Sequence, residues 1–175
     1  RDRCESVHGF YYHFVDARTG ARAWNSEVSS IDTVLFLAGA LTAARAYPGT
    51  EVDSIAQALY ERVEWDWMYA GGPTVSMGWK PEGGFLPYRW SNYDEASLLY
   101  LLAIGSPTHP IPPAAWGAVH REIGVYGGHA CLVSPPLFTH QFSHLFVDFR
   151  NRNDGRFDYW KSSVEATLAN RQFCI

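Results

Sequence analysis

Two acidic residues have the spacing and the surroundings of a catalytic pair. Asp32 closes the segment Ser29-Ser-Ile-Asp32, and Glu95 closes the segment Asn92-Tyr-Asp-Glu95. Cleavage of a glycosidic bond needs a general acid that protonates the leaving oxygen and a second carboxylate that acts as base or nucleophile. The same spacing is that of a capping box, in which the carboxylate only satisfies free amides at the start of a helix. Because Thr50-Glu-Val-Asp53 repeats it, the sequence leaves both interpretations open.

The surroundings of Glu95 favour acid chemistry. The preceding residues, Tyr88-Arg-Trp-Ser-Asn-Tyr-Asp94, place two tyrosines, a tryptophan and an arginine beside the carboxyl group. An aromatic cluster removes water from a carboxyl group and raises its pKa, as a general acid requires. The sequence therefore predicts an acid at Glu95 and a second carboxylate at Asp32.

The aromatic content points to a carbohydrate ligand. The chain has 7 Trp and 10 Tyr in 175 residues, and several of them stand in short polar stretches. Sugar rings present apolar C–H faces that stack on aromatic rings, while their hydroxyl groups bind carboxylates, amides and arginines. Interleaved aromatic and polar residues suit a carbohydrate cleft, although ordinary core packing of the rings is an open alternative.

Two histidines suggest a different chemistry. His140 and His144 form an H-x-x-x-H pair, and Asp148 follows four residues later, so one face of a helix would carry all three as a metal site. Gln141 stands where the zinc-peptidase pattern HExxH requires Glu. Buried histidines bonded to neighbours or to sugar hydroxyls are the favoured interpretation, and a metal-dependent hydrolase is the alternative.

Charge and hydropathy exclude other classes of function. The net charge of −4 argues against a nucleic-acid partner, because phosphate binding needs clustered Lys and Arg. The sequence contains no run of about 18 apolar residues, so no membrane span is expected. The three cysteines are widely separated, which fits free thiols better than a disulfide framework or a zinc site.

The elements that position these residues are predicted to be mainly helical. A short extended segment is expected at residues 9–15, and apolar helices are expected at 30–47, 94–104 and 137–150. Each is followed by an outer helix, the first beginning at Thr50 and the others expected at 112–123 and 157–174. We therefore expect an all-α fold, an incomplete (α/α)6 toroid of about three inner and outer helix pairs. The enclosed helices would begin at one mouth of this ring, where Asp32 and Glu95 would meet.

Several segments resemble a known family. They are GFYYHFVDARTGAR, SSIDTVLFLAGAL, LYERVEWDWM, GWKPEGGFLPYRW, YDEASLLYLLAIGSPTHP and PLFTHQFSHLFVDFR. Together they resemble the bacterial glucoamylase-like domain family, which includes endo-β-1,2-glucanases and the transglycosylating domain of cyclic β-1,2-glucan synthases. The resemblance covers essentially the whole chain. It implies an (α/α)6 toroid with a glucan-binding cleft, no cofactor or metal, and export to the periplasm or secretion.

The resemblance also assigns roles to residues. The family's Y-[ND]-E-A motif makes Glu95 a catalytic candidate, and its S-x-I-D-T motif places Asp32 at the cleft. The family's domain continues past Ile175 through a G-Y-G-E segment with another cleft carboxylate. Residues 1–175 are therefore expected to be a partial domain, truncated on its C-terminal side and inactive alone.

The expected function is cleavage or transfer of β-1,2-linked glucan by paired carboxylates. The partner is an oligosaccharide or polysaccharide substrate, and a non-catalytic carbohydrate-binding module is an alternative. Hydrolase and transglycosylase, and retaining and inverting mechanisms, stay open. The residues expected to bind the substrate are Tyr12, His13, Trp79, Tyr88, Arg89, Trp90, Tyr93, Asp94, His140, Gln141 and His144.

Overall fold

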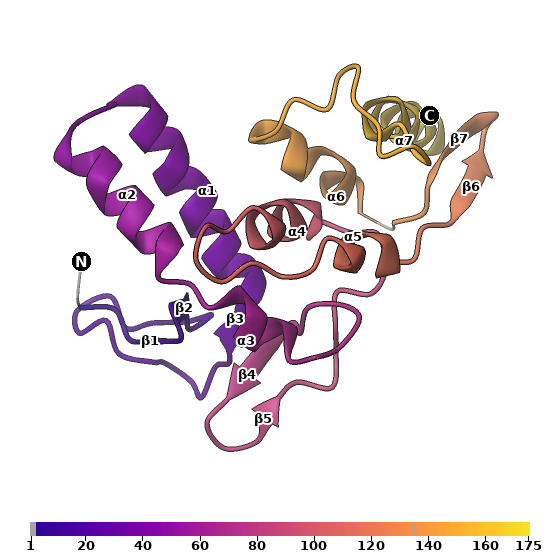
Figure 1. The fold of residues 1–175 in the computed structure, drawn as a ribbon. Helices are drawn as coiled ribbons and strands as arrows, with labels where there is room; N and C mark the ends of the chain where they lie inside the picture. Colours follow the sequence, from indigo (N-terminus) through magenta and orange to yellow (C-terminus); the bar gives the residue numbers. More distant parts are fainter. Residues whose placement is uncertain (1–2, 135) are drawn as a thin grey trace. The chain divides into compact units, whose positions relative to one another are not determined.

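A computed structural model describes residues 3–134 and 136–175 of the chain. The structure is 41% helical and 15% strand, with three small antiparallel sheets. The chain divides into two compact units (Figure 1). The first unit comprises Arg1–Trp90 and Leu99–Ala118, and the second comprises Ser91–Leu98 and Val119–Ile175.

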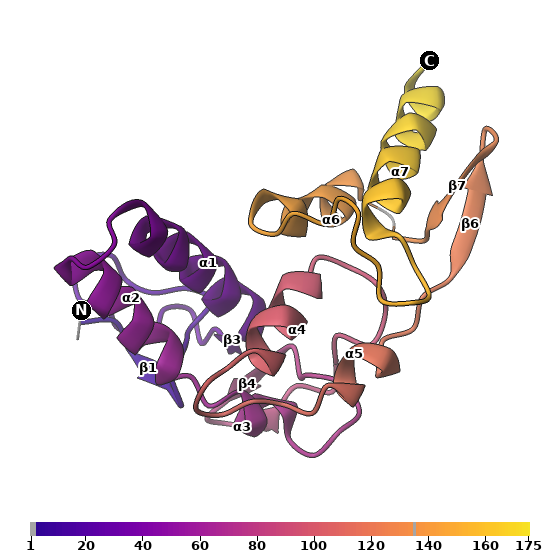
Figure 2. The same ribbon diagram turned by 45° about the horizontal axis from the view of Figure 1, so that its top comes forward.

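Two antiparallel helices, α1 (Ser30–Ala46) and α2 (Glu51–Glu61), lie side by side in the first unit (Figures 1 and 2). Ser29 caps α1, because its hydroxyl oxygen accepts a hydrogen bond from the Asp32 amide. The predicted helix at 30–47 is thus confirmed. It is not enclosed on every side, since Phe36 remains 49% exposed.

Short strands complete this unit. Strands β1 (Ser6–Val7) and β2 (Phe10–Tyr11) form a hairpin. Strands β3 (Val28–Ser29), β4 (Gly78–Lys80) and β5 (Gly84–Phe85) form a second sheet in that order. Since β3 runs directly into α1, this sheet fixes the position of the first turn of α1 and of Asp32 within it. A Cβ atom at Gly78 would lie 2.5 Å from the Val28 carbonyl oxygen, so this register requires glycine.

Three shorter helices are α3 (Trp65–Tyr69), α4 (Ser97–Ile104) and α5 (Ala114–Ala118). Helix α4 contributes its first two residues to the second unit and the rest to the first. The Tyr100 hydroxyl is buried in the first unit, where it donates to the Trp90 carbonyl at 2.6 Å.

The second unit combines a hairpin with a long helix. Strands β6 (Ile123–Tyr126) and β7 (His129–Leu132) pair in register, and α7 (Tyr159–Cys174) lies along β7 (Figures 1 and 2). The Leu132 amide donates to the Ser162 hydroxyl oxygen at 3.0 Å. Helix α6 (Leu137–Gln141) continues into a 3₁₀ turn, η1 (Phe142–Leu145).

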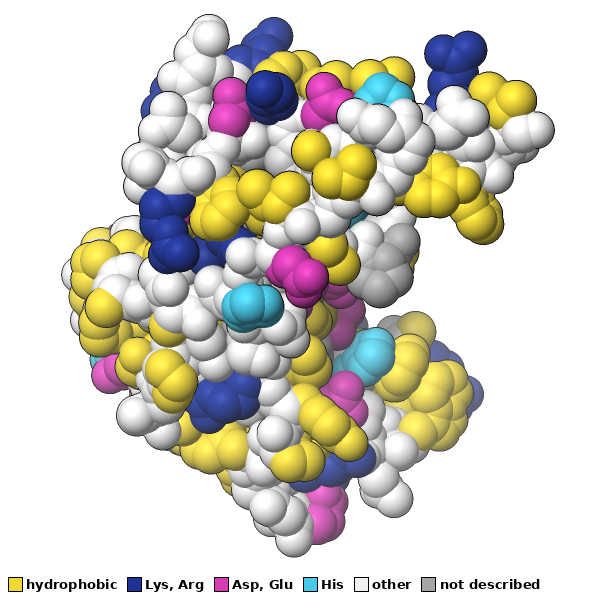
Figure 3. Space-filling model, turned by 90° about the vertical axis from the view of Figure 1, so that its right-hand side faces the viewer, with side chains coloured by type: hydrophobic (Ala, Val, Ile, Leu, Met, Phe, Trp, Pro, Cys, Tyr) yellow, Lys and Arg dark blue, Asp and Glu magenta, His cyan; other side chains and the backbone are white. Residues whose placement is uncertain are grey.

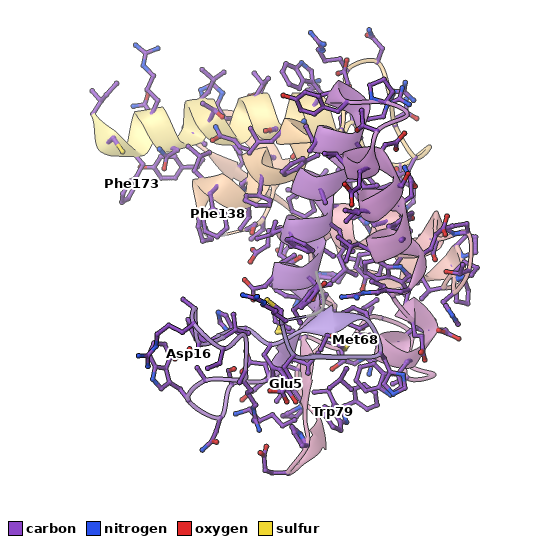
Figure 4. All side chains as sticks on the ribbon, turned by 90° about the vertical axis from the view of Figure 1, so that its left-hand side faces the viewer. Glu5, Asp16, Met68, Trp79, Phe138 and Phe173 are labelled. Atoms are coloured by element: carbon purple, nitrogen blue, oxygen red, sulfur yellow. The ribbon has the colours of Figure 1, made fainter. Side chains whose placement is uncertain are left out.

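Apolar side chains also reach the surface. On the face shown in Figure 3, hydrophobic side chains appear at several places. In the second unit, Phe138 of α6 is 52% exposed and Phe173 of α7 is 73% exposed (Figure 4). A cavity of about 450 Å³ lies between the hairpin and α7, with Val125, Leu132 and Phe173 in its wall.

No helix among residues 3–134 and 136–175 is both long and apolar enough to cross a membrane.

The prediction of an all-α toroid is wrong, because hairpins and short turns replace two of the expected helices. The expected helix at 112–123 is reduced to α5, and β6 follows it. Gly127 and Gly128 have φ values of 56° and 85°, as the two central residues of a tight hairpin turn often do. The expected helix at 137–150 is also interrupted, because η1 begins at Phe142.

The junction of β3 and α1 provides a stability test. The Ser30 hydroxyl is fully buried, accepts the Trp90 indole N–H at 2.9 Å and donates toward the Ser76 carbonyl oxygen at 2.9 Å. We expect Ser30→Ala to lower the free energy of unfolding by about 1–3 kcal/mol, because it leaves a buried donor without its acceptor. Urea unfolding measures the loss. The control is Ser54→Ala on exposed α2, and equal urea midpoints for the two variants would contradict the prediction.

Candidate functional site

Asp32 lies in the first turn of α1. Its carboxylate Oδ2 accepts the Ser29 hydroxyl at 2.5 Å, and its amide donates to the same hydroxyl oxygen at 3.2 Å. Ser29 therefore caps the helix as the sequence predicted. In a capping box the carboxylate would instead accept the backbone amide of Ser29. Within the described part of the chain, Oδ1 of Asp32 accepts no hydrogen bond, so one carboxylate oxygen is free to act on a ligand.

A histidine links Asp32 to a second acid. His13 Nδ1 lies 2.8 Å from Glu27 Oε1, and His13 Nε2 lies 3.7 Å from Asp32 Oδ2. Burial raises the pKa of Glu27, but hydrogen bonds from its own amide and from His13, with the charges of His13 and Lys80, outweigh burial and leave the pKa below its ordinary value. The imidazole thus stands between two carboxylates.

The sequence analysis did not select Glu27. Glu27 and Ser29 alternate along the extended segment that forms β3, so both side chains point to one face of it. This alternation is the sequence signal that could have placed Glu27 near the start of α1. The link to His13 depends on a tertiary contact.

A cavity of about 560 Å³ opens beside Asp32 in the first unit. Its wall is mainly apolar and aromatic, and the residues that form it include Tyr11, Tyr12, Val15, Asp32, Phe36 and Leu59. Tyr12 is buried, and burial together with the charge of Glu5 raises the pKa of its hydroxyl. An apolar cavity with one acidic group in its wall is the general form of a small-molecule site.

The other predicted residues of the first unit have different environments. The Arg89 guanidinium donates to the carbonyl oxygens of Thr74 and Tyr69, and the Trp90 indole donates to Ser30. These two side chains bind the protein's own chain.

Tyr88 and Trp79 are more accessible than Trp90. Tyr88 is 67% exposed. Trp79 of β4, labelled in Figure 4, is half-buried and packs against Trp67 with ring centroids 5.7 Å apart. Either ring could contact a ligand at the surface of the first unit.

In the second unit, Asp94 has the strongly perturbed carboxyl group. Burial, reinforced by the charge of Glu95, raises the pKa of Asp94 from 3.8 to about 7, although the Ala96 amide and Arg121 oppose the shift. Its Oδ1 accepts the Ala96 amide at 2.9 Å. The sequence placed a desolvated carboxyl group at Glu95, whereas the structure shows desolvation acting on its neighbour Asp94.

Glu95 is half-buried and does not cap α4. Helix α4 begins at Ser97, and the Ser143 hydroxyl oxygen accepts the Leu98 amide at 3.1 Å in place of a carboxylate. Across residues 3–134 and 136–175, the Glu95 carboxylate makes no hydrogen bond or ion pair. The capping-box interpretation of Glu95 is therefore wrong, and its carboxylate is available for chemistry.

Tyr93 forms the buried aromatic neighbour of these acids. Its ring centroid lies 5.5 Å from that of His140 and 6.2 Å from that of Tyr159. Burial raises the pKa of the Tyr93 hydroxyl to about 12. The backbone is fixed here as well, because the Tyr93 amide donates to the His120 carbonyl oxygen at 2.9 Å.

The proposed metal ligands do not assemble. The α-helix gives way to a 3₁₀ turn after Gln141, and Asp148 lies beyond that turn in an ion pair with Arg150 at 2.8 Å. His140 is buried with Nε2 3.1 Å from the Ser134 carbonyl oxygen, and burial lowers the pKa values of both His140 and His144.

The described residues contain no cluster of three or more His, Cys, Asp or Glu that could hold a metal ion. The geometry therefore does not support the alternative of a metal site formed by His140, His144 and Asp148. Gln141, the remaining predicted residue on α6, is exposed and donates to the Thr167 hydroxyl oxygen at 3.1 Å.

The raised pKa of Asp94 predicts a pH-dependent stability. The folded state keeps Asp94 protonated up to about pH 7, whereas the unfolded chain ionises it near 3.8, so its stabilising effect is complete below pH 3.8 and is lost as the pH rises through 7. We expect Asp94→Asn to remove this slope, which amounts to at most roughly 4 kcal/mol. Urea unfolding between pH 4 and pH 8 measures it.

Asp148→Asn is the matched control with the opposite sign. Hydrogen bonds from Arg150 lower the pKa of Asp148 to about 2, so its contribution is present above pH 3.8 and is lost as the pH falls through 2. This variant should leave the slope between pH 4 and pH 8 unchanged. A wild-type slope in Asp94→Asn would contradict the assignment.

Comparison with known proteins places the chain in a family. The family model Glycoamylase, described as "Putative glucoamylase", matches residues 87–175. A search of curated proteins gives no match. This chain spans about half the length of three similar solved structures and about a third of a fourth.

Three of these structures share the fold of this chain over nearly its whole length. A putative glucoamylase from Bacteroides uniformis is 21% identical with a TM-score of 0.87, and the match covers 99% of this chain and 48% of that one. An endo-β-1,2-glucanase from Chitinophaga pinensis, in complex with sophorotriose and glucose, is 23% identical with a TM-score of 0.85, covering 99% and 47%. A putative glucoamylase from Bacteroides caccae is 25% identical with a TM-score of 0.84, covering 99% and 48%.

The family match spans just over half of the chain, and it includes both carboxylates of the Asp94–Glu95 segment. The resemblance seen in the sequence motifs is therefore confirmed. The chain belongs to the "Putative glucoamylase" family of glycan-active enzymes.

Proposed function

We propose that the whole protein to which this chain belongs cleaves or transfers β-1,2-linked glucan. The support is membership of the family and the likeness to the Chitinophaga pinensis endo-β-1,2-glucanase. At 23% identity this likeness establishes the fold, and the substrate is our proposal. We also propose a periplasmic or secreted location, which cell fractionation would test.

The observation that carries the proposal is the pair of adjacent carboxyl groups at Asp94 and Glu95. Asp94 occupies surroundings that hold its pKa at about 7, and the neighbouring Glu95 carboxylate has no partner among the described residues. Glycosidases place two carboxyl groups in different surroundings so that the two take different roles, and this dipeptide offers such a difference.

We assign the proton donor to Glu95. Asp94 is half-buried and already accepts the Ala96 amide, so its role is to bind a sugar hydroxyl or to shape the site. Glu95 has both carboxylate oxygens available to a glycosidic oxygen.

Asp32 is the proposed second carboxylate, acting as base or nucleophile. The Ser29 hydroxyl and His13 orient its Oδ2, and Oδ1 is left for a water molecule or an anomeric carbon. Asp32 belongs to the first unit and Glu95 to the second, so this assignment rests on the chemistry of each residue within its own unit.

We expect Glu95→Gln in the whole protein to lower kcat on linear β-1,2-glucan by about 10²–10⁴-fold, because Gln cannot deliver a proton. Substrate binding and folding should change little, since Gln keeps the size of Glu. A glucoside with an activated aryl leaving group needs little protonation and should recover much of the rate. Reducing-end release and aryl release measure the two rates.

Two further variants make the test decisive. Asp53→Asn, in the first turn of α2 where Oδ2 accepts the Gly49 amide at 2.9 Å, should be nearly silent. Asp94→Asn should weaken turnover less than Glu95→Gln and should show no selective rescue by the activated substrate. If the rescue appears in Asp94→Asn and not in Glu95→Gln, the acid is Asp94 and the assignment to Glu95 is wrong.

The linkage preference is a separate prediction. The whole protein should have a higher kcat/KM for linear β-1,2-glucan than for starch or cellulose. Cleavage of α-1,4-glucan at comparable kcat/KM would overturn the proposed substrate. Product analysis separates the two reactions, because transglycosylation gives cyclic or longer products and hydrolysis gives only shorter ones.

A further inference from the structure

We propose that Trp24, Phe14 and His13 form a stacking subsite for a glucosyl ring on the first unit. This inference rests on the proposed function and names residues that would hold the glucan near Asp32. Trp24 was not among the residues that the sequence suggested. We refer to the three rings as the aromatic row.

The backbone at Trp24 is unusual. The Ser26 amide donates to the Ala23 carbonyl oxygen at 3.1 Å, which closes a four-residue turn. Its two central residues, Trp24 and Asn25, have φ values of 54° and 52°, as in a type I′ turn. Such turns favour Asn and Gly, and a bulky residue with positive φ is disfavoured. Tryptophan at this position therefore works against local stability.

Hydrogen bonds within and around this turn nevertheless hold its backbone in place. The buried Ser26 hydroxyl donates to the Phe14 carbonyl oxygen at 3.1 Å and accepts the Phe14 amide at 3.3 Å. The Ala23 amide donates to the Phe14 carbonyl oxygen at 2.9 Å, and Arg22 Nε donates to the Ser26 carbonyl oxygen at 2.6 Å. Strained residues that their surroundings hold in place are typical of ligand-binding sites.

This scaffold presents the indole to solvent. Trp24 is 84% exposed, so most of the hydrophobic gain from burying it is forgone. Its ring lies 5.1 Å from that of Phe14, which is 44% exposed and stacks on His13 at 4.1 Å with an interplanar angle of 13°. The three rings thus make a continuous aromatic surface.

At its His13 end, the aromatic row lies beside two carboxylates. His13 Nδ1 lies 2.8 Å from Glu27, and its Nε2 lies 3.7 Å from Asp32. Apolar ring faces suit the C–H face of a pyranose, and adjacent carboxylates suit its hydroxyl groups. A protein partner would need a larger apolar surface than these rings offer, so the observations favour a sugar.

The test compares Trp24→Ala with wild type in the whole protein, using linear β-1,2-glucan oligosaccharides. We expect KM to rise by about tenfold with a smaller change in kcat, as loss of a stacking contact removes binding energy. Trp24→Phe should retain most of the affinity. The control is Tyr47→Ala, which removes a 60% exposed ring at the far end of α1 and should leave KM unchanged.

A second measurement separates a ligand role from a structural one. Trp24→Gly relieves the positive φ and should raise the melting temperature while it weakens glucan binding. A structural role for Trp24 predicts the reverse, namely a lower melting temperature with unchanged KM. That result would overturn the subsite.

The outcomes distinguish the subsite from the proposed function. Turnover of β-1,2-glucan with a wild-type KM in Trp24→Ala would overturn the subsite and leave the function standing. If wild type binds α-1,4-linked oligosaccharides instead, and Trp24→Ala weakens that binding, the aromatic row is a sugar site and the proposed linkage is wrong. Loss of self-association in Trp24→Ala with unchanged glucan binding would show a protein contact and overturn the subsite.

Discussion

The first unit depends on one buried hydroxyl group at the junction of β3 and α1. Ser30 accepts the Trp90 indole N–H and donates toward the carbonyl oxygens of Ser76 and Met77, so it ties the start of α1 to two segments distant in sequence. Without this hydroxyl the Trp90 indole N–H would lose its acceptor and the Ser76 carbonyl oxygen its donor, and unpaired polar groups in a protein interior are costly. The junction therefore fixes the first turn of α1, and Asp32 stands in that turn. Its neighbour Ser29 both caps the helix and orients the Asp32 carboxylate.

In the second unit, too, a hydroxyl group fixes the start of a helix, and it does so in place of the expected carboxylate. Ser143 accepts the Leu98 amide and donates to the Glu95 carbonyl oxygen, so the start of α4 is satisfied from η1. The Glu95 side chain therefore does not have the helix-capping role that its spacing in the sequence suggested. The preceding residue, Asp94, is also half-buried, and desolvation there raises its pKa. The two acids of one dipeptide thus have different surroundings and can have different roles.

The sequence predicted those parts of the fold that local interactions determine. Helices α1 and α7 were expected at 30–47 and 157–174, and in the structure Ser29 and Asp158 cap them. The hairpin β6–β7 was missed although Tyr126-Gly-Gly-His129 has a two-residue turn pattern, because the neighbouring apolar residues were assigned to a helix. Asp32, Glu95 and His13 were selected as candidates from motifs and a resemblance. The contacts of Glu27 with His13 and of Ser143 with Glu95 could not be predicted, because they join segments distant in sequence.

The two places where chemistry is proposed share a physical property. Trp24 is an exposed aromatic residue with positive φ, and Asp94 is a desolvated acid that costs stability once it ionises above about pH 7, so each is unfavourable for its own unit. In both cases hydrogen bonds to the backbone hold the unfavourable state, from Ser26 in the first unit and from the Ala96 amide in the second. A residue selected only for stability would be Gly or Asn in the turn and an uncharged side chain at position 94. Unfavourable residues on well-bonded scaffolds are therefore the physical ground, independent of any family motif, on which we propose that these two positions serve a ligand.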